Sequence, residues 1–432
     1  MKYRILNLLQ QLSTSHWFMP LILSFCSVLL LSLCIWLDLT LTKNHILSYG
    51  LGFQISKESI QQLMTIIITV SISITCVILS ITMLTLSFTS NLLGPRLIPN
   101  FIRQGKTQTI IGVFISIYIY CLTLLTVSST NYAKDNPMLI TLYVGIGLAL
   151  TSFIMLIYFI HHISQAIQVS NILEQLSIEV TNSINRLFLE TKPKKNNVFS
   201  SIHQKQLYKE KTKIIINKQG YIQTVNYQSL KTIATENNML IELIKKSGHF
   251  IFDDMVIGYI YHNKDVSDST HKQIINCLAT GKTRTSVQDI EYGFDQIAEI
   301  AVRALSPGIN NPYTAINCIH KIGYLLQHLS KRFPPESYLL DEDNKIRVVS
   351  PFLSYKGVID IAINQIRQNS HTHVSVTIEL IKTAGNILAL ELPEPMKIAL
   401  QVQAKIIYEQ SHQEKFSEYD KKKIESEYFK LL

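Results

Sequence analysis

Charged side chains are scarce in this sequence. Asp, Glu, Lys and Arg make up 16% of its 432 residues, whereas hydrophobic residues make up 47%. Soluble domains typically carry about 25% charged residues. The apolar residues are concentrated before about Ile160. This distribution argues against one large soluble core and predicts an integral membrane domain followed by a water-exposed domain.

Signatures of metal and cofactor sites are also lacking. None of the six cysteines belongs to a CxxC pair, so the sequence predicts neither a disulfide framework nor a zinc site. Residues 281–283 resemble the end of a phosphate-binding loop, but Asn276 stands where that loop needs a glycine. We therefore predict no bound metal, no cofactor and no nucleotide hydrolysis.

Four runs without Asp, Glu, Lys or Arg are long enough to cross a bilayer, which needs about 20 residues of helix. The first run carries Trp17 and Trp36 near its ends, where aromatic rings favour the membrane interfaces. A cleaved signal peptide is the alternative for this run, but it is long and lacks a small-residue cleavage site. We expect four transmembrane helices within residues 1–162, at residues 17–37, 63–88, 109–127 and 138–160.

The loops between these runs differ in charge. By the positive-inside rule, the more basic side of the membrane is the cytoplasmic one. We therefore predict a multi-pass protein of the inner membrane with both termini in the cytoplasm. The basic positions are Lys2, Arg4, Arg96, Arg103 and Lys106, and the acidic positions in the other loops are Asp38, Glu58 and Asp135.

A lysine-rich segment at residues 191–213 accounts for much of the formal net charge of +9. It follows the last span closely and has no aromatic residues interleaved in a nucleic-acid motif. Attraction to anionic lipid headgroups explains its charge more simply than nucleic-acid binding. We predict lipid contact at this linker and no nucleic acid.

The remaining chain divides into a helical stalk with the basic linker (163–212), a small β module (213–265) and a mainly helical cytoplasmic domain (266–432). The fold class is thus a four-helix membrane domain followed by a cytoplasmic α+β domain. Within the β module, strand-like runs flank a predicted helix at 227–248. Residues 339–349 are typical of an exposed hairpin with an Asp-Asn turn.

The stalk has a short heptad-like seam, which must pack on a partner. That partner is either a second copy, which makes the protein a homo-oligomer, or the domain that follows. The seam residues are Val169, Leu173, Leu176, Val180 and Leu187.

Hydroxyl side chains form two stripes on the second span. Packing against neighbouring helices is the favoured interpretation, because Ser and Thr bond to their own helix backbone and permit close approach. The alternative is that one stripe lines a water-filled path. The candidate pore-lining residues are Thr65, Thr69, Ser73, Ser80 and Ser87, and the opposite stripe holds Ser71, Thr75, Thr82, Thr85 and Thr89.

Helix breakers are dense in "RALSPGINNPYTAINCI", residues 303–319. Pro307 ends one helix, and Asn311 with Pro312 fits the N-cap and first position of the next. This corner explains the breakers, but amides at a helix N-terminus also suit an anion. The candidate ligand-binding residues are Arg284, Asp289, Arg303, Ser306, Gly308, Asn310, Asn311 and Thr314.

Asp295, Glu299 and Arg303 share one helical face before the corner. An ion-pair ladder is favoured over acid-base chemistry at this face.

The stretch "QDIEYGFDQIAEIAVRALSPGINNPYTA", with "GKTRT" before it, "GPRLIPNF" after the second span and "QIRQNS" later, resembles the bacterial predicted membrane proteins of domain of unknown function 2254. The resemblance implies an integral membrane protein and supplies no reaction, substrate or cofactor. In the pattern of that family, Asp tends to stand at the positions of Asn311, His320 and His249. These departures disfavour an enzyme.

Two hypotheses follow. The first is a non-enzymatic membrane oligomer for passage of an ion or small solute or for sensing. The alternative is a membrane-tethered enzyme or ligand-binding regulator with its site at residues 306–314.

Overall fold

The computed structural model describes residues 18–43, 57–94, 105–129, 139–192, 205–351 and 353–431. The chain divides into two compact units, Met1–Gln168 and Val169–Leu432. Several charges used for the topology prediction lie outside the described residues, as does most of the basic linker; they are Lys2, Arg4, Arg96, Arg103, Asp135 and residues 193–204.

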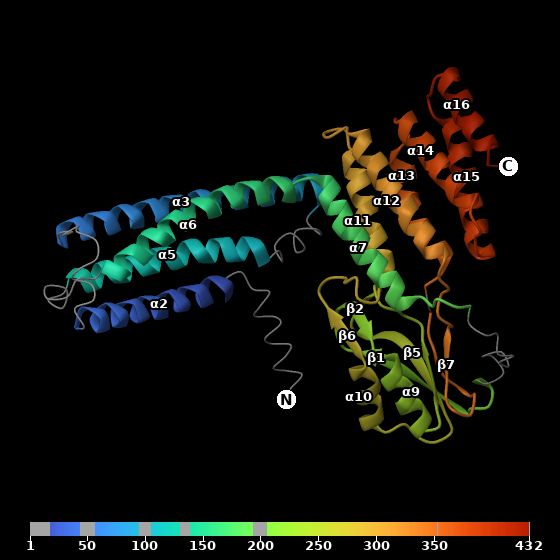
Figure 1. The fold of residues 1–432 in the computed structure, drawn as a ribbon. Helices are drawn as coiled ribbons and strands as arrows, with labels where there is room; N and C mark the ends of the chain where they lie inside the picture. Colours follow the sequence, from blue (N-terminus) through green and yellow to red (C-terminus); the bar gives the residue numbers. More distant parts are fainter. Residues whose placement is uncertain are drawn as a thin grey trace. The chain divides into compact units, whose positions relative to one another are not determined.

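The first unit contains four long apolar helices, which confirms the four predicted by hydrophobicity. They are drawn side by side in Figure 1. The apolar runs within them are 22 to 31 residues long, and at ~1.5 Å per residue each exceeds the ~30 Å of a hydrocarbon core. The helices are α2 (Phe18–Lys43), α3 (Lys57–Leu93), α5 (Gly105–Ser129) and α6 (Leu139–Ala166).

Helix α5 contacts each of the other three helices of this unit. Its Tyr120 is fully buried, and the Tyr120 hydroxyl donates to the Thr141 carbonyl at 2.9 Å. Gly112 allows α5 to approach α2 closely, because a Cβ there would lie 2.7 Å from Leu23 Cδ1 and 3.0 Å from Pro20 Cα. The outer faces carry exposed apolar side chains, as a lipid-facing bundle requires; among them are Phe25, Leu33, Leu84, Ile154 and Ile157.

Asp38 lies inside α2, although the sequence interpretation placed it in a loop. The carboxylate is only 3% exposed. It accepts from the backbone amides of Ile140 at 2.9 Å and Thr141 at 3.0 Å, and from the Thr141 hydroxyl at 2.5 Å. The buried charge thus caps the first turn of α6, where amides lack partners within their own helix.

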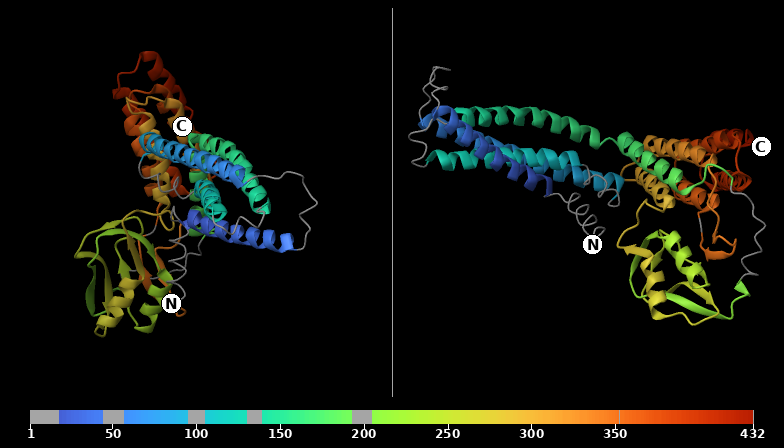
Figure 2. Two further views of the ribbon diagram at one scale, coloured as in Figure 1. Left: turned by 90° about the vertical axis from the view of Figure 1, so that its left-hand side faces the viewer. Right: turned by 60° about the horizontal axis from the view of Figure 1, so that its bottom comes forward.

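The second unit combines strands with nine further helices among the residues that the structure describes. Figure 2 shows from two more sides that the strands gather on one side of the later helices, which are coloured orange to red. The helices are α7 (Val169–Leu187), α9 (Tyr227–Glu236), α10 (Asp268–Asn276), α11 (Ile290–Ala304), α12 (Pro312–Ser330), α13 (Tyr355–Asn369), α14 (Val374–Leu388), α15 (Glu394–Gln413) and, at the end of the described chain, α16 (Glu418–Phe429).

The strands form two sheets. The five-stranded sheet has the order β1-β5-β3-β8-β7, and the three-stranded sheet has the order β4-β2-β6. Only β3 and β8 pair in parallel within the described sheets. The strands are β1 (Glu210–Ile216), β2 (Gly220–Val225), β3 (Leu240–Leu243), β4 (Phe250–Ile251), β5 (Met255–His262), β6 (Leu278–Gly281), β7 (Tyr338–Leu340) and β8 (Ile346–Val349).

The predicted hairpin is present as β7 and β8, but it is not an exposed appendage. Asp341 and Arg347 are 8% and 4% exposed, and their side chains pair at 2.6 Å. Burial alone would raise the pKa of the Asp341 carboxyl, but hydrogen bonds from Arg347 and the Lys345 amide outweigh it and lower that pKa. The hairpin is therefore an integral part of the five-stranded sheet.

The heptad-like seam of α7 packs within its own unit. Leu173, Leu176 and Val180 are buried, and α7 contacts α11 and α12. Burying each such side chain contributes roughly 1.5–3 kcal/mol. Gly293 on α11 permits this contact, because a Cβ there would lie 2.3 Å from Val180 Cγ2. Of the two partners considered from the sequence, these seam residues use the domain that follows.

Candidate functional site

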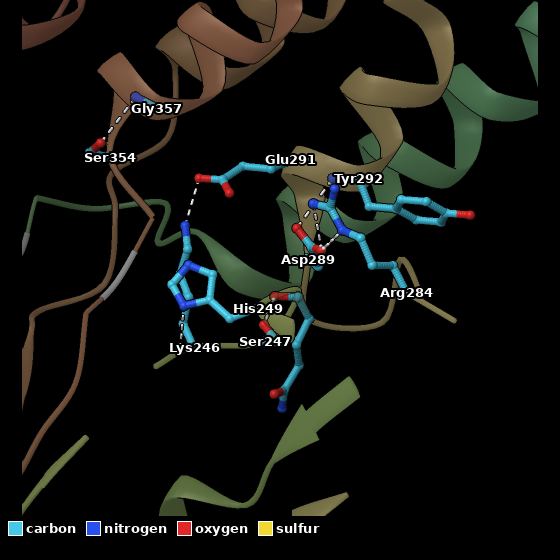
Figure 3. A network of polar contacts seen from close by, with 10 residues as sticks. Lys246, Ser247, His249, Arg284, Asp289, Glu291, Tyr292, Ser354 and Gly357 are labelled. Atoms are coloured by element: carbon cyan, nitrogen blue, oxygen red, sulfur yellow. Dashed lines mark hydrogen bonds and ion pairs between the residues drawn. The ribbon is translucent and has the colours of Figure 1, made fainter. Parts of the chain in front are cut away.

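The N-terminus of α11 is organised by Asp289. Its carboxylate accepts from the Tyr292 amide at 3.2 Å and is only 1% exposed. Arg284 binds the same carboxylate through Nε at 2.9 Å and Nη2 at 2.8 Å, and reaches Asp295 Oδ2 at 3.4 Å. Burial raises the pKa of the Asp289 carboxyl, and the Arg284 charge opposes that change. The predicted residues Arg284 and Asp289 therefore form one ion-paired helix cap (Figure 3).

A turn of the β module lies directly against this cap. Gly248 has a φ of +89°, and a Cβ there would lie 2.2 Å from Asp289 Oδ2. Only glycine adopts this conformation readily and leaves room for the carboxylate. The turn and the start of α11 are thus held in fixed contact.

Two side chains of the same turn reach further into the first turn of α11. Lys246 pairs with Glu291 at 2.6 Å, and the two side chains are 14% and 12% exposed. Ser247 donates to the Gln288 carbonyl at 2.6 Å. Figure 3 shows Glu291 also facing the start of α13, where the Ser354 hydroxyl accepts from the Gly357 amide at 3.1 Å. A Cβ at Gly357 would come within 3.1 Å of Glu291 Oε1.

His249 closes this turn. Its Nδ1 accepts from the Lys246 amide at 3.3 Å, so this nitrogen must be unprotonated. Burial and the neighbouring charges of Lys246 and Lys245 lower the pKa of the His249 imidazole. The neutral ring is therefore the form that the folded turn favours.

An open pocket of about 610 Å³ begins at this turn. That volume lies within the range of small-molecule sites. Lys246, Ser247 and Gln288 line its polar end, and Arg186 also borders it. Apolar side chains make up much of the remaining wall; they are Leu187, Leu189, Leu339, Leu353, Pro335 and Pro351.

The structure separates the predicted ligand-binding residues into two groups. Arg284 and Asp289 lie at the N-terminal end of α11, whereas Arg303 lies in its last turn and the corner follows it. The helix has 15 residues and so spans about 22 Å. Arg303 pairs with Glu299 at 3.2 Å, while Asp295 is bonded to Arg284, so the predicted face splits between two partners.

Backbone contacts account for the corner. Asn310 has a φ of +46°, Asn311 accepts from the Thr314 amide at 3.2 Å, and the Ser306 hydroxyl donates to the Arg303 carbonyl at 2.7 Å. The predicted N-cap at Asn311 with Pro312 at the helix start is confirmed. A Cβ added at Gly308 would meet no atom within 4 Å. Ligand binding at residues 306–314 stays a prediction.

The candidate pore-lining residues all lie on the exposed face of α3. Thr65, Thr69, Ser73 and Ser80 each donate to the carbonyl four residues earlier, at 2.8 to 2.9 Å. The opposite stripe faces the bundle, since Ser71, Thr85 and Thr89 are 2–3% exposed. A path along Thr65, Thr69, Ser73, Ser80 and Ser87 would therefore need further chains to enclose it.

Sequence reasoning missed the residues that form the polar end of the pocket. Gln288 stood within the quoted family stretch, but it belonged to no recognised motif. Lys246 and Arg186 come from segments 60 residues apart, and only the fold brings them to one cavity. No cluster of three or more metal-binding side chains occurs in the part of the chain that the structure describes.

Comparison with known proteins assigns a family. A family model described as "Predicted membrane protein (DUF2254)" matches residues 13–385. Similar chains include "Uncharacterized protein Rv1290c" of Mycobacterium tuberculosis and "Uncharacterized protein Mb1321c" of Mycobacterium bovis. Each is 22% identical over 350 residues, which cover 80% of this chain and 67% of the relative. No solved structure matches the chain.

Proposed function

We propose a ligand-sensing role for this chain, which belongs to the DUF2254 family of predicted membrane proteins. Its four apolar helices contact lipid, and in this proposal the second unit binds a small molecule in the pocket. One observation carries the proposal: the turn that forms the polar end of the pocket also holds the start of α11. Sensing is proposed in place of catalysis.

The contacts give a physical route from pocket to helices. Lys246 lines the pocket and pairs with Glu291 in the first turn of α11. Ser247 also lines it and bonds to Gln288, next to the Asp289 cap. A ligand that binds either side chain changes the contacts at the start of α11. Binding energy can shift a conformational equilibrium only through such differential contacts.

Hydrogen exchange of the full chain in lipid nanodiscs tests this role against a library of small molecules. A ligand should slow exchange at the amides of residues 290–293 and 355–358, because it stabilises both helix starts. Leu353→Trp fills the pocket and should abolish the response. Tyr313→Trp is the matched control, because Tyr313 is 79% exposed at the start of α12. An unchanged response in Leu353→Trp would contradict the proposal.

The membrane topology belongs to the same proposal. We place both termini in the cytoplasm of an inner-membrane protein, with the basic linker against anionic headgroups, because lysines and arginines dominate these segments. A C-terminal tag should resist protease added to intact spheroplasts and become sensitive after lysis. Cleavage before lysis would overturn this orientation.

Passage of an ion or solute through a homo-oligomer is the second candidate function. The exposed hydroxyl stripe of α3 favours it, because such a stripe can meet the same stripe of a second copy. Native mass spectrometry from nanodiscs should then detect a defined oligomer, and Thr69→Val should change ion flux. A strict monomer would exclude this function.

A further inference from the structure

Arg186 stands out among the residues around the pocket. It lies in the last turn of α7, and its Nη2 donates to the Val287 carbonyl at 2.6 Å and the Ser286 carbonyl at 3.4 Å. These acceptors are neutral. Among the residues that the structure describes, no acid lies within ion-pair distance of Arg186. The guanidinium is therefore fixed in direction while its charge is not neutralised by a described neighbour.

The other cation of the pocket is placed differently. Lys246 is 14% exposed and is paired with Glu291, which leaves ammonium hydrogens for a further acceptor. Glu336 is the one acid among the described lining residues, and it lies beside the Tyr338 hydroxyl. The lining thus carries two cations and one acid, and Glu291 pairs with Lys246 from outside the lining. Arg186 is therefore the cation of the lining that can take an anionic ligand group as its ion-pair partner.

The remaining wall of the pocket is apolar and favours a ligand with a hydrocarbon part. Four leucines and two prolines line the pocket, and apolar surface of this kind is stabilised by burying hydrocarbon. A free inorganic anion would leave that surface wet. The pocket therefore suits a molecule with a charged head and an apolar body.

We propose that the ligand is a single-chain anionic amphiphile whose carboxylate or phosphate head binds Arg186 and Lys246 while its chain lies along the leucines. This inference rests on the proposed sensing function and names its ligand class. Arg186 sets the preference for charge, and the apolar wall sets the need for a chain. Such molecules arise from membrane lipids or as free metabolites, and the two sources share this chemistry.

A single-tryptophan quenching experiment on the full chain in zwitterionic nanodiscs tests the inference. The two native tryptophans are replaced by Trp17→Phe and Trp36→Phe, and Tyr338→Trp places a reporter in the pocket wall. The probe is 11-bromoundecanoic acid, since bromine quenches tryptophan on contact. Its matched neutral analogue is 11-bromoundecanol, and acetate and inorganic phosphate serve as anions without a chain. An 11-bromoundecyl phosphomonoester distinguishes a lipid-like phosphate head from a carboxylate.

We expect saturable quenching by the acid and about tenfold weaker binding of the alcohol, because a charge-assisted hydrogen bond to the head is lost. Acetate and phosphate should not displace the acid. Arg186→Gln keeps a donor for the Val287 carbonyl but removes the charge. It should weaken binding of the acid about tenfold and leave binding of the alcohol unchanged. Arg303→Gln, at the far end of α11, should change neither.

The outcomes separate the two proposals. Equal binding of acid and alcohol, or no effect of Arg186→Gln, overturns the anionic ligand class while pocket binding stands. No saturable quenching at Tyr338→Trp, or the same quenching with a reporter at Tyr313→Trp, overturns the amphiphile inference, whereas the sensing proposal stands or falls with the hydrogen-exchange experiment. Leu339→Trp provides a second pocket reporter if Tyr338→Trp fails to fold.

Discussion

Polar side chains serve opposite purposes in the two units of this molecule. In the membrane helices most described hydroxyls donate to carbonyls three or four residues earlier in their own helix. In the second unit, polar side chains connect segments far apart in sequence, as Lys246 does with Glu291 and Arg186 with Val287. Local contacts leave a helix self-sufficient in lipid, whereas distant contacts make the second unit dependent on its assembled fold.

Gly248→Val should produce the largest effect, because it breaks the turn on which the distant contacts depend. Its Cβ would collide with Asp289 Oδ2, and the φ of +89° is strained for a branched residue. We expect a loss of about 3 kcal/mol or more of unfolding free energy. Thermal unfolding, monitored by hydrogen exchange, measures this loss of stability. Gly308→Ala, which meets no atom within 4 Å, should stay within about 0.5 kcal/mol, and an equal loss in both variants would contradict the comparison.

Asp38→Ala should produce the next largest effect, because Asp38, unlike most polar side chains of the membrane unit, bonds to another helix. It bonds to a helix about 100 residues later and leaves two amides and a hydroxyl without an acceptor when removed. The expected loss is about 2 kcal/mol, measured by denaturant unfolding in mixed micelles. Asp38→Asn keeps one oxygen and should lose less. Wild-type stability in Asp38→Ala would show that the cap contributes nothing.

His249 gives the second unit a dependence on pH. Its pKa is lowered from 6.5 on folding, so the unfolded chain binds more protons just below that pH. The contribution of the neutral ring is fully present above pH 6.5 and is lost as pH falls below it, by at most ~1.4 kcal/mol per pH unit. Thermal unfolding at pH 7.5 and 5.5 measures the change. His249→Gln keeps an acceptor for the Lys246 amide and should reduce the loss of stability between pH 7.5 and 5.5. The same loss in this variant would contradict the assignment of the pH dependence to His249.

The outward hydroxyls of α3 should produce the smallest effect. Thr69→Val and Ser73→Ala remove bonds to the same helix and should change stability by less than about 0.5 kcal/mol. Thr141→Val is the matched comparison, because its hydroxyl donates to Asp38 on another helix. Unfolding in mixed micelles should rank Thr141→Val as the more destabilising. A large loss at Ser73 would indicate a partner that a single chain does not supply.

Sequence patterns predicted the structure correctly where it depends on residues close together in the chain. Hydrophobic length predicted the four apolar helices, and Asn311 with Pro312 predicted the start of α12. The predicted helix at residues 227–248 was wrong in its second half. It ends at Glu236, Asn238 takes a φ of +47°, and Leu240–Leu243 form strand β3. A short apolar run has no periodicity that separates strand from helix, so only its pairing with β5 and β8 decides.

The pocket was beyond prediction for the same reason. Lys246 stood in a segment interpreted as helix, and Arg186 stood in the stalk. Neither residue belongs to a recognised motif, and each lines the pocket only because other segments of the chain pack beside it. The breaker-rich corner attracted attention through composition, yet its polar groups bond mainly to their own backbone.

The parallel pairing of β3 with β8 has a consequence for biosynthesis. Ile241 and Val348 are register partners, so the ribosome adds more than a hundred residues before the central strand acquires its second neighbour. Closing so long a loop slows folding and leaves an unpaired strand available to other chains. The nascent chain is therefore most vulnerable to misassociation after β5 has emerged and before β8 has, when its preceding helices are already being inserted.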